Sequence, residues 1–134
     1  MIDIILVSHG SLAAGMREAA EMILGGQENL FVLDLYPGDT LESFSVRLEQ
    51  TIDQCRDQKN VLILSDLLNG TPHHAAMVMT LKKGASCIAG CNLPLVLEAV
   101  SMRDESSDVK ELVNLLCETG RKGVVSSEEL MRRS

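Results

Sequence analysis

Two residues far apart in the chain, His9 and Asp66, have side chains that can act together as a catalytic pair. A carboxylate that accepts a hydrogen bond from one imidazole nitrogen fixes the tautomer of the ring and leaves the lone pair of the other nitrogen free. That nitrogen can then serve as a base, a nucleophile or a metal ligand. Taken singly, His9 could equally be a packing residue and Asp66 a loop cap, so the pairing depends on the fold.

The segment Asn69-Gly70-Thr71-Pro72 has the composition of a helix N-terminus that could receive an anion. Pro72 suits the first helical position, with Thr71 as the cap, and such an end offers free N–H groups and a positive dipole to phosphate. Any capped helix looks similar, but opposite a histidine this one would form an oxyanion cradle. His73 and His74 occupy adjacent helical positions, which diverge by about 100°. We therefore expect no metal site there and interpret both as exposed or packing side chains, unless one faces the site.

The chain contains no P-loop, no glycine-rich dinucleotide fingerprint and no acidic cluster for Mg²⁺. The chemistry that the residues favour is therefore phosphate relayed through histidine, with no cofactor.

The elements that must position these residues alternate along the chain. Apolar, β-branched runs predict strands over 2–7, 30–35, 61–64 and 86–89. Five helices are expected after these strands. The first is capped by Ser11 and stopped by Gly25-Gly26, and the second follows the turn at 36–39. The third runs from Pro72 to about Gly84, the fourth begins at Pro94, and the fifth begins near Ser107. Apolar residues at helical spacing predict the inward faces Leu12, Met16, Ala19 and Ile23; Leu41, Phe44, Leu48 and Ile52; and Val109, Leu112, Val113 and Leu116.

This alternation predicts a doubly wound α/β fold with a mainly parallel open sheet of about four strands. In such a sheet ligands bind beyond the carboxyl ends of the strands, where His9 and Asp66 both fall. We expect residues 1–122 to form one domain and 123–134 a tail. Val124 and Val125 in the tail are strand-like and would form an antiparallel edge strand or fray.

Composition excludes several classes of function. The 134 residues include 12 Lys+Arg against 19 Asp+Glu, a net charge of −7, and aromatic residues make up only 2%. This argues against binding to nucleic acid or anionic lipid. The sequence lacks an apolar run of membrane-spanning length and a signal peptide, so we expect a cytoplasmic protein. The four cysteines have no zinc-site spacing and are interpreted as reduced and mostly buried.

Over essentially its whole length the chain resembles the enzyme IIA component of the mannose-type family of the bacterial phosphoenolpyruvate-dependent sugar phosphotransferase system. The resemblance rests on several motifs in the right order: Val7-Ser8-His9-Gly10, Glu21-Met22-Ile23-Leu24-Gly25, Asp66-Leu67-Leu68-Asn69-Gly70-Thr71-Pro72, Ala89-Gly90-Cys91-Asn92-Leu93-Pro94 and Glu118-Thr119-Gly120-Arg121.

The resemblance implies a phosphocarrier. His9 would take phosphate at Nε2 from the phosphocarrier protein HPr and pass it to a IIB component, which serves membrane IIC and IID components. Asp66 would hold the Nδ1 side of the ring, and the phosphoryl group would be bound around Gly10, Ser11, Asn69, Gly70 and Thr71. Members are commonly homodimers, in some of which a C-terminal strand is exchanged.

Two positions depart from the family's usual pattern. Asn69-Gly70 stands where two glycines are usual, and His73-His74 stands where a Phe-Asn pair often follows the proline. Asn tolerates left-handed backbone, so the turn is expected to survive. The departures bear on the finer phosphate contacts and on the partner surface, and they leave His9 and Asp66 untouched.

Three alternatives remain open. Small tetrapyrrole metal chelatases begin with a similar Ser-His-Gly-Ser turn, but that hypothesis needs a second histidine and leaves 66–72 unexplained. The phosphocarrier subunit of dihydroxyacetone kinase shares the fold and a strand-one histidine. A related sensory domain of transcription activators would have to work here through partner binding alone.

Overall fold

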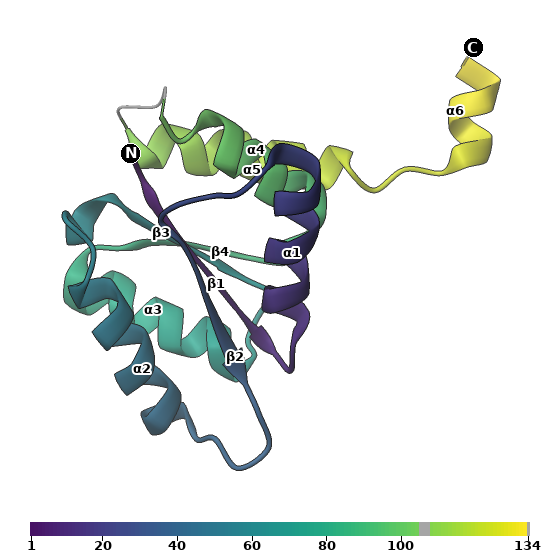
Figure 1. Ribbon diagram of the computed structural model, residues 1–134. Coiled ribbons are helices and arrows are strands. Elements are labelled where there is room, and N and C mark those ends of the chain that lie inside the picture. The colour runs from purple at the N-terminus through teal and green to yellow at the C-terminus, as the bar shows by residue number, and fades with distance from the viewer. Residues whose placement is uncertain (105–107, 134) are drawn as a thin grey trace.

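A computed structural model describes residues 1–104 and 108–133, which form a parallel sheet with helices on both faces (Figure 1). The strands are β1 (Asp3–His9), β2 (Leu30–Leu35), β3 (Val61–Ser65) and β4 (Ser86–Ala89), in the spatial order β2-β1-β3-β4. The helices are α1 (Leu12–Leu24), α2 (Leu41–Asp53), α3 (Thr71–Lys83), α4 (Leu93–Met102), α5 (Val109–Lys122) and α6 (Ser127–Arg133), and the 3-10 turn η1 (Gln58–Asn60) precedes β3. The predicted α/β fold with a parallel sheet of four strands is confirmed.

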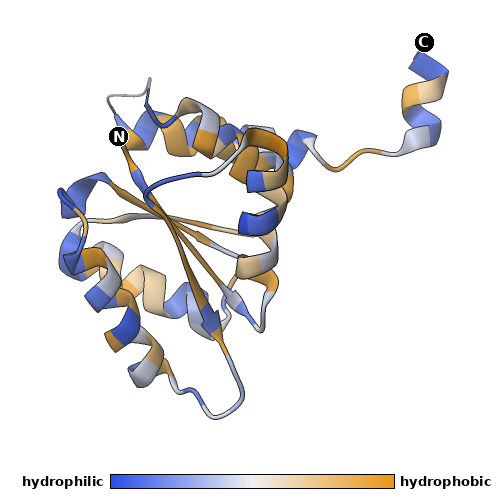
Figure 2. Cartoon of the chain, viewed as in Figure 1, coloured by the Kyte–Doolittle hydropathy of each residue, from blue (hydrophilic) through white to orange (hydrophobic). Residues whose placement is uncertain are grey.

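The sheet separates two apolar cores. Ile4 and Leu6 of β1 face the core beneath α1, α4 and α5, whereas Ile5 and Val7 face the core beneath α2 and α3. A strand covered on both faces must be apolar at successive positions, which explains the mostly hydrophobic colour of the strands in Figure 2, with blue near the carboxyl end of β2. In register, Val7 lies beside Leu33 of β2 and Ser65 of β3. The residues that follow Val7 and Ser65 therefore emerge at the same sheet edge.

Two helix faces differ from the sequence prediction. In α1 the buried residues are Ala13, Met16 and Ala20, while Leu12 and Ile23 are exposed. The alanines share the same helical spacing, and their small side chains let the helix approach the sheet closely. In α2 the predicted inward residues Phe44, Leu48 and Ile52 are buried, but Leu41, at the first helical position, is exposed.

Two predicted side-chain caps are also wrong. Ser11 stands at the N-cap of α1 but its hydroxyl makes no capping bond; Ser8 Oγ instead accepts from the N–H of Ala13 at 2.7 Å. Thr71 is already inside α3, and Gly70 is the N-cap. The predicted start of the last helix, Ser107, lies outside the described residues, and α5 begins at Val109 after Asp108.

The C-terminal segment is not a strand. Val124 and Val125 lie in a short connection between α5 and α6, and Figure 1 shows this segment projecting from the body of the fold. The N–H of Val124 is tied to the carbonyl of Arg121, so little chain is left for strand pairing. Acidic residues in the first turn of α6 and arginines in its last turn favour the helix over an extended edge.

Two further sequence observations can be compared with the structure. All four cysteines are free, and burial raises the pKa of the Cys87 and Cys91 thiols to about 12, which makes them poor nucleophiles. Within the described residues, no helix is both long enough and apolar enough to cross a membrane.

A buried arginine holds the amino ends of the strands together. Arg103, 2% exposed, donates to the carbonyls of Asn29 at 2.8 Å, Glu28 at 2.6 Å and Ile2 at 3.4 Å, and to Oε1 of Gln27 at 3.1 Å. Burial lowers its pKa, against the attraction of Asp104 and Asp3. The side chain thus joins the end of α4 to the starts of β1 and β2.

We expect Arg103→Met to lower the free energy of unfolding by about 3 kcal/mol, because it leaves buried carbonyl oxygens without donors. Urea unfolding followed by far-UV circular dichroism measures this. Arg17→Met removes a partly exposed arginine that pairs with Glu21 one turn away, and it should change stability by less than about 0.5 kcal/mol. Equal effects of the two substitutions would contradict the role assigned to Arg103.

Candidate functional site

His9 and Asp66 form a hydrogen-bonded pair at the carboxyl edge of the sheet. His9 is the last residue of β1, and Asp66 directly follows β3, whose register with β1 places the two side by side. Oδ2 of Asp66 lies 2.9 Å from Nδ1 of His9 and also accepts the backbone N–H of His9 at 3.0 Å. One carboxylate oxygen therefore fixes both the ring and the main chain of the histidine.

The exposure of the two side chains differs in a way that suits catalysis. The His9 side chain is 47% exposed, whereas that of Asp66 is only 8% exposed. Because an ionised carboxylate can only accept, Nδ1 carries the proton and Nε2 keeps its lone pair. The structure therefore holds a half-exposed imidazole in one orientation, with the Nε2 lone pair free and a mostly buried anion at Nδ1.

Gly70 packs directly against the imidazole of His9. A Cβ added at Gly70 would lie 2.7 Å from Cε1 and 3.4 Å from Nε2 of the ring. Its backbone, with φ −81° and ψ 169°, is open to any residue, so the need for glycine here is one of space. The N-terminus of α3 thus lies against the Nε2 side of the histidine ring.

For the phosphorylation of His9 that the family resemblance implies, we expect Gly70→Ala to slow the reaction about tenfold, because the methyl group pushes the ring from its place beside Asp66. The measurement is the initial rate of phosphoryl incorporation. Gly26→Ala adds the same methyl group where nothing lies within 4 Å and should leave the rate unchanged. A normal rate in Gly70→Ala would show that the ring can shift without cost.

His73 holds the loop that carries Gly70. Its ring is 8% exposed, and Nδ1 accepts the backbone N–H of Asn69 at 3.1 Å. Asn69 has a left-handed backbone, with φ 67°, a conformation that costs energy for any residue with a side chain. The bond from His73 stabilises this turn. Of the two histidines, His73 is therefore a packed residue and His74 is exposed.

Replacing His73 by Phe should lower the free energy of unfolding by about 1–2 kcal/mol, because the Asn69 N–H loses its acceptor. In His73→Asn the amide oxygen can take the place of Nδ1, so we expect most of the stability to return. Urea unfolding of the three proteins at one pH gives the comparison. A Phe variant as stable as the Asn variant would argue that only ring packing matters.

The remaining predicted phosphate contacts divide into two groups. The N–H of Gly10, with φ 54°, donates to the carbonyl of Leu35 at 2.7 Å, and that of Asn69 is taken by His73. Among the described residues, the N–H groups of Ser11 and Thr71 have no backbone acceptor. Ser11 and Thr71 stand at the N-terminal ends of α1 and α3, so their amides remain available to an anion.

Sequence reasoning missed three features of this site. The hydroxyl of Ser8 caps α1, the ring of His73 holds the loop, and Oδ1 of Asp66 is buried without a hydrogen-bond partner among the described residues. Cys91, which follows β4, lies near enough to Asp66 for the carboxylate to help raise the pKa of the thiol. The position of Cys91 after a predicted strand was the one sequence signal that placed it at this edge.

Comparison with known proteins gives a consistent result. A family model, EIIA-man, described as PTS system fructose IIA component, matches residues 3–116. The chain is 34% identical over 131 residues to the PTS system sorbose-specific EIIA component of Lacticaseibacillus casei, covering 97% of this chain and 94% of that protein. It is 36% identical over 124 residues to the mannose-specific EIIAB component of Escherichia coli K12, covering 92% of this chain but only 38% of that longer protein.

A solved structure has the same fold. The crystal structure of a phosphotransferase system component EIIA from Streptococcus agalactiae superposes with a TM-score of 0.89, at 28% identity, and covers 96% of this chain and 99% of that one. Sequence and structural similarity therefore extend over nearly the whole chain.

Proposed function

Because the chain belongs to the EIIA-man family and is a IIA component of the sugar phosphotransferase system, we propose that it carries a phosphoryl group on Nε2 of His9. The observation that carries the proposal is the 2.9 Å contact between Nδ1 of His9 and Oδ2 of Asp66, which leaves Nε2 as the free nucleophile. The donor is phosphorylated HPr and the acceptor is a IIB component.

In the proposed reaction Nε2 attacks the phosphorus of phosphorylated HPr. A bond forms between Nε2 and phosphorus, the phosphorus–nitrogen bond of HPr breaks, and its electron pair returns to the HPr ring. The His9 ring becomes more positive as it donates its lone pair, and the buried carboxylate of Asp66 stabilises that charge through Nδ1–H. Transfer to IIB is the same step in reverse, with the IIB nucleophile attacking phosphorus.

The phosphoryl oxygens are proposed to meet the two helix N-termini that border His9. The backbone amides of Ser11 and Thr71 are available to them, while Gly70 leaves space beside the ring. Gly10 and Asn69 contribute through loop shape, because their own amides already donate elsewhere. Stabilisation by amides and helix dipoles requires no metal ion.

Exposed apolar side chains support a protein partner at this edge. Leu12 at the start of α1 and Leu67 and Leu68 in the loop after β3 are 52%, 56% and 64% exposed, respectively. Surfaces of this kind mark sites of protein contact. HPr and IIB are the proposed direct partners, membrane IIC and IID components the indirect ones, and the cytoplasm is the proposed location. With a net charge of −7, nucleic acid is not a proposed partner.

The tail supports a proposal about assembly. We propose that residues 1–122 form the phosphocarrier domain and that residues 123–134 are a tail that contacts a second copy in a homodimer. Val124 and Val125 are 78% and 57% exposed in the single chain, which a second copy would cover. Light scattering of the purified chain distinguishes a dimer from a monomer.

The function is tested by incubating the chain with phosphoenolpyruvate, enzyme I and HPr and then measuring its mass. We expect a gain of one acid-labile phosphoryl group, which is lost again when a IIB component is added. No gain, or a gain that survives acid, contradicts the proposal. The metal chelatase alternative is not favoured, because the family match accounts for the segment from Asp66 to Pro72 that the chelatase hypothesis leaves unexplained.

A further inference from the structure

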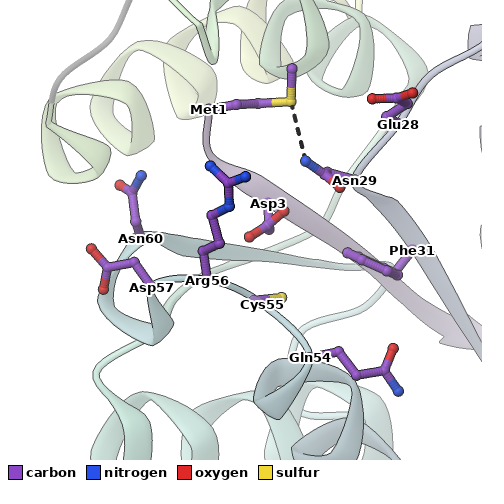
Figure 3. A pocket seen from close by; sticks show the side chains of 10 residues that line it. All are labelled: Met1, Asp3, Glu28, Asn29, Phe31, Gln54, Cys55, Arg56, Asp57 and Asn60. Carbon is purple, nitrogen blue, oxygen red and sulfur yellow. Dashed lines mark hydrogen bonds between the residues drawn. The ribbon is translucent and has the colours of Figure 1, made fainter.

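A second candidate site lies at the opposite edge of the sheet. A cavity of about 420 Å³ opens at the amino ends of the strands, and Asp3, Phe31, Cys55, Arg56, Glu28 and Asp57 are among its lining residues (Figure 3). Asp3 and His9 are the two ends of β1, so at about 3.3 Å per residue the cavity is some 20 Å from the phosphorylation site. The cavity is therefore separate from the site of phosphoryl transfer.

The side chain of Asp3 is mostly buried and lines this cavity. Asp3 is 7% exposed, and within the described part of the chain no N–H or hydroxyl group donates to its side chain. Burial and the nearby Asp3 carboxylate raise the pKa of the Cys55 thiol to about 12, but its Sγ donates to the carbonyl of Thr51 at 3.5 Å. Arg103 attracts Asp3, but its guanidinium is bonded to four other oxygens. A carboxylate that lines a cavity and has unused acceptor positions can accept a hydrogen bond from a bound donor.

Arg56 supplies a positive charge to the same cavity. Its side chain is exposed and crosses the mouth toward Met1 (Figure 3). Among the residues described, Arg56 forms no ion pair or hydrogen bond, so it does not neutralise Asp3. The cavity thus contains a carboxylate with unused acceptor positions at its floor and an unpaired guanidinium at its mouth.

From these charges we infer that the cavity binds a small zwitterion of the α-amino acid class, with a cationic side chain. The ligand's ammonium group would donate to Asp3 and its carboxylate would accept from Arg56, in the bidentate geometry that a guanidinium favours. Glu28 and Asp57, which also line the cavity, favour the additional positive charge, and Phe31 adds apolar lining that the methylene chain can contact. The described residues contain no group of three or more metal-ligating side chains, so a bare metal ion fits less well.

The test is isothermal titration calorimetry of the whole chain with L-lysine. We expect saturable binding of one molecule per chain with a Kd of about 1 mM or tighter. Asp3→Asn should weaken binding at least about tenfold, because the neutral amide keeps the shape but loses the charge. Asp104→Asn removes the same charge from an exposed position outside the cavity and should leave lysine binding unchanged.

Further probes make the inference falsifiable if Asp3→Asn fails to fold. In Arg56→Met, an exposed position, we expect weaker binding of lysine but no weakening for putrescine, which has ammonium groups and no carboxylate. Absence of lysine binding to the unmodified chain would overturn the inference, as would equal binding of lysine by the unmodified chain and Arg56→Met. Tighter binding of putrescine than of lysine would overturn the assignment of a zwitterionic ligand and would identify the cavity as a site for diamines.

Discussion

His9→Gln should abolish the phosphoryl gain of the chain. Only the free Nε2 lone pair can attack phosphorus, and a carboxamide has no nitrogen lone pair of comparable basicity. Because the side chain of His9 is 47% exposed, the substitution removes little packing, and the glutamine can still contact Asp66. Mass measurement after incubation with phosphoenolpyruvate, enzyme I and HPr should therefore find the unmodified mass on a folded protein.

His74→Gln is the matched control for this result. His74 is exposed near the start of α3 and makes no hydrogen bond with Asp66 among the described residues, so its loss should leave phosphorylation intact. Far-UV circular dichroism establishes that both variants fold. If His9→Gln still gained an acid-labile phosphoryl group, another histidine would be the carrier and the pairing of His9 with Asp66 would have a structural purpose.

The strands were predictable because the turn residues that bound them and the apolar, β-branched residues within them indicate the same segments. The bounds predicted for β2 and β4 match the structure at both ends, where left-handed residues such as Asn29 and Gly90 mark the turns. Helix faces were less predictable, because two sets of residues in α1 share one spacing and only packing selects the alanines. The edge strand predicted for the tail did not form for another reason. β-branched residues favour a strand only where a neighbouring strand can pair with them.

The core of the site followed from topology. In a parallel sheet, residues that end neighbouring strands must meet, so His9 and Asp66 could be paired from their positions in the predicted strands. The bond from Asn69 to His73 could not be predicted, because it depends on the rotamer of one ring and on a left-handed residue. The buried contacts of Arg103 reach residues more than 70 positions away in sequence. The hydrophobic periodicity of the sequence cannot predict a contact between residues so far apart.

Asp66→Asn should slow phosphoryl transfer about a hundredfold while leaving the fold intact. Oδ2 of Asp66 accepts both the N–H and the Nδ1–H of His9, so the asparagine must place its oxygen there to keep both bonds. Its NH₂ group then occupies the position of Oδ1, which is buried and has no partner among the described residues. The carboxamide also lacks the negative charge that stabilises the ring as it donates its lone pair.

The loss should therefore appear in the rate constant for transfer within the complex, with the affinity for HPr unchanged. Rapid-quench kinetics at several HPr concentrations separate the two quantities. Asp34→Asn is the control, since Asp34 also lies near the carboxyl edge, in β2, but bonds Tyr36 rather than His9; it should change the rate less than about threefold. Similar slowing in both variants would mean that the rate responds to the general field of the edge. Slowing confined to Asp66→Asn would assign the effect to the carboxylate that touches the ring.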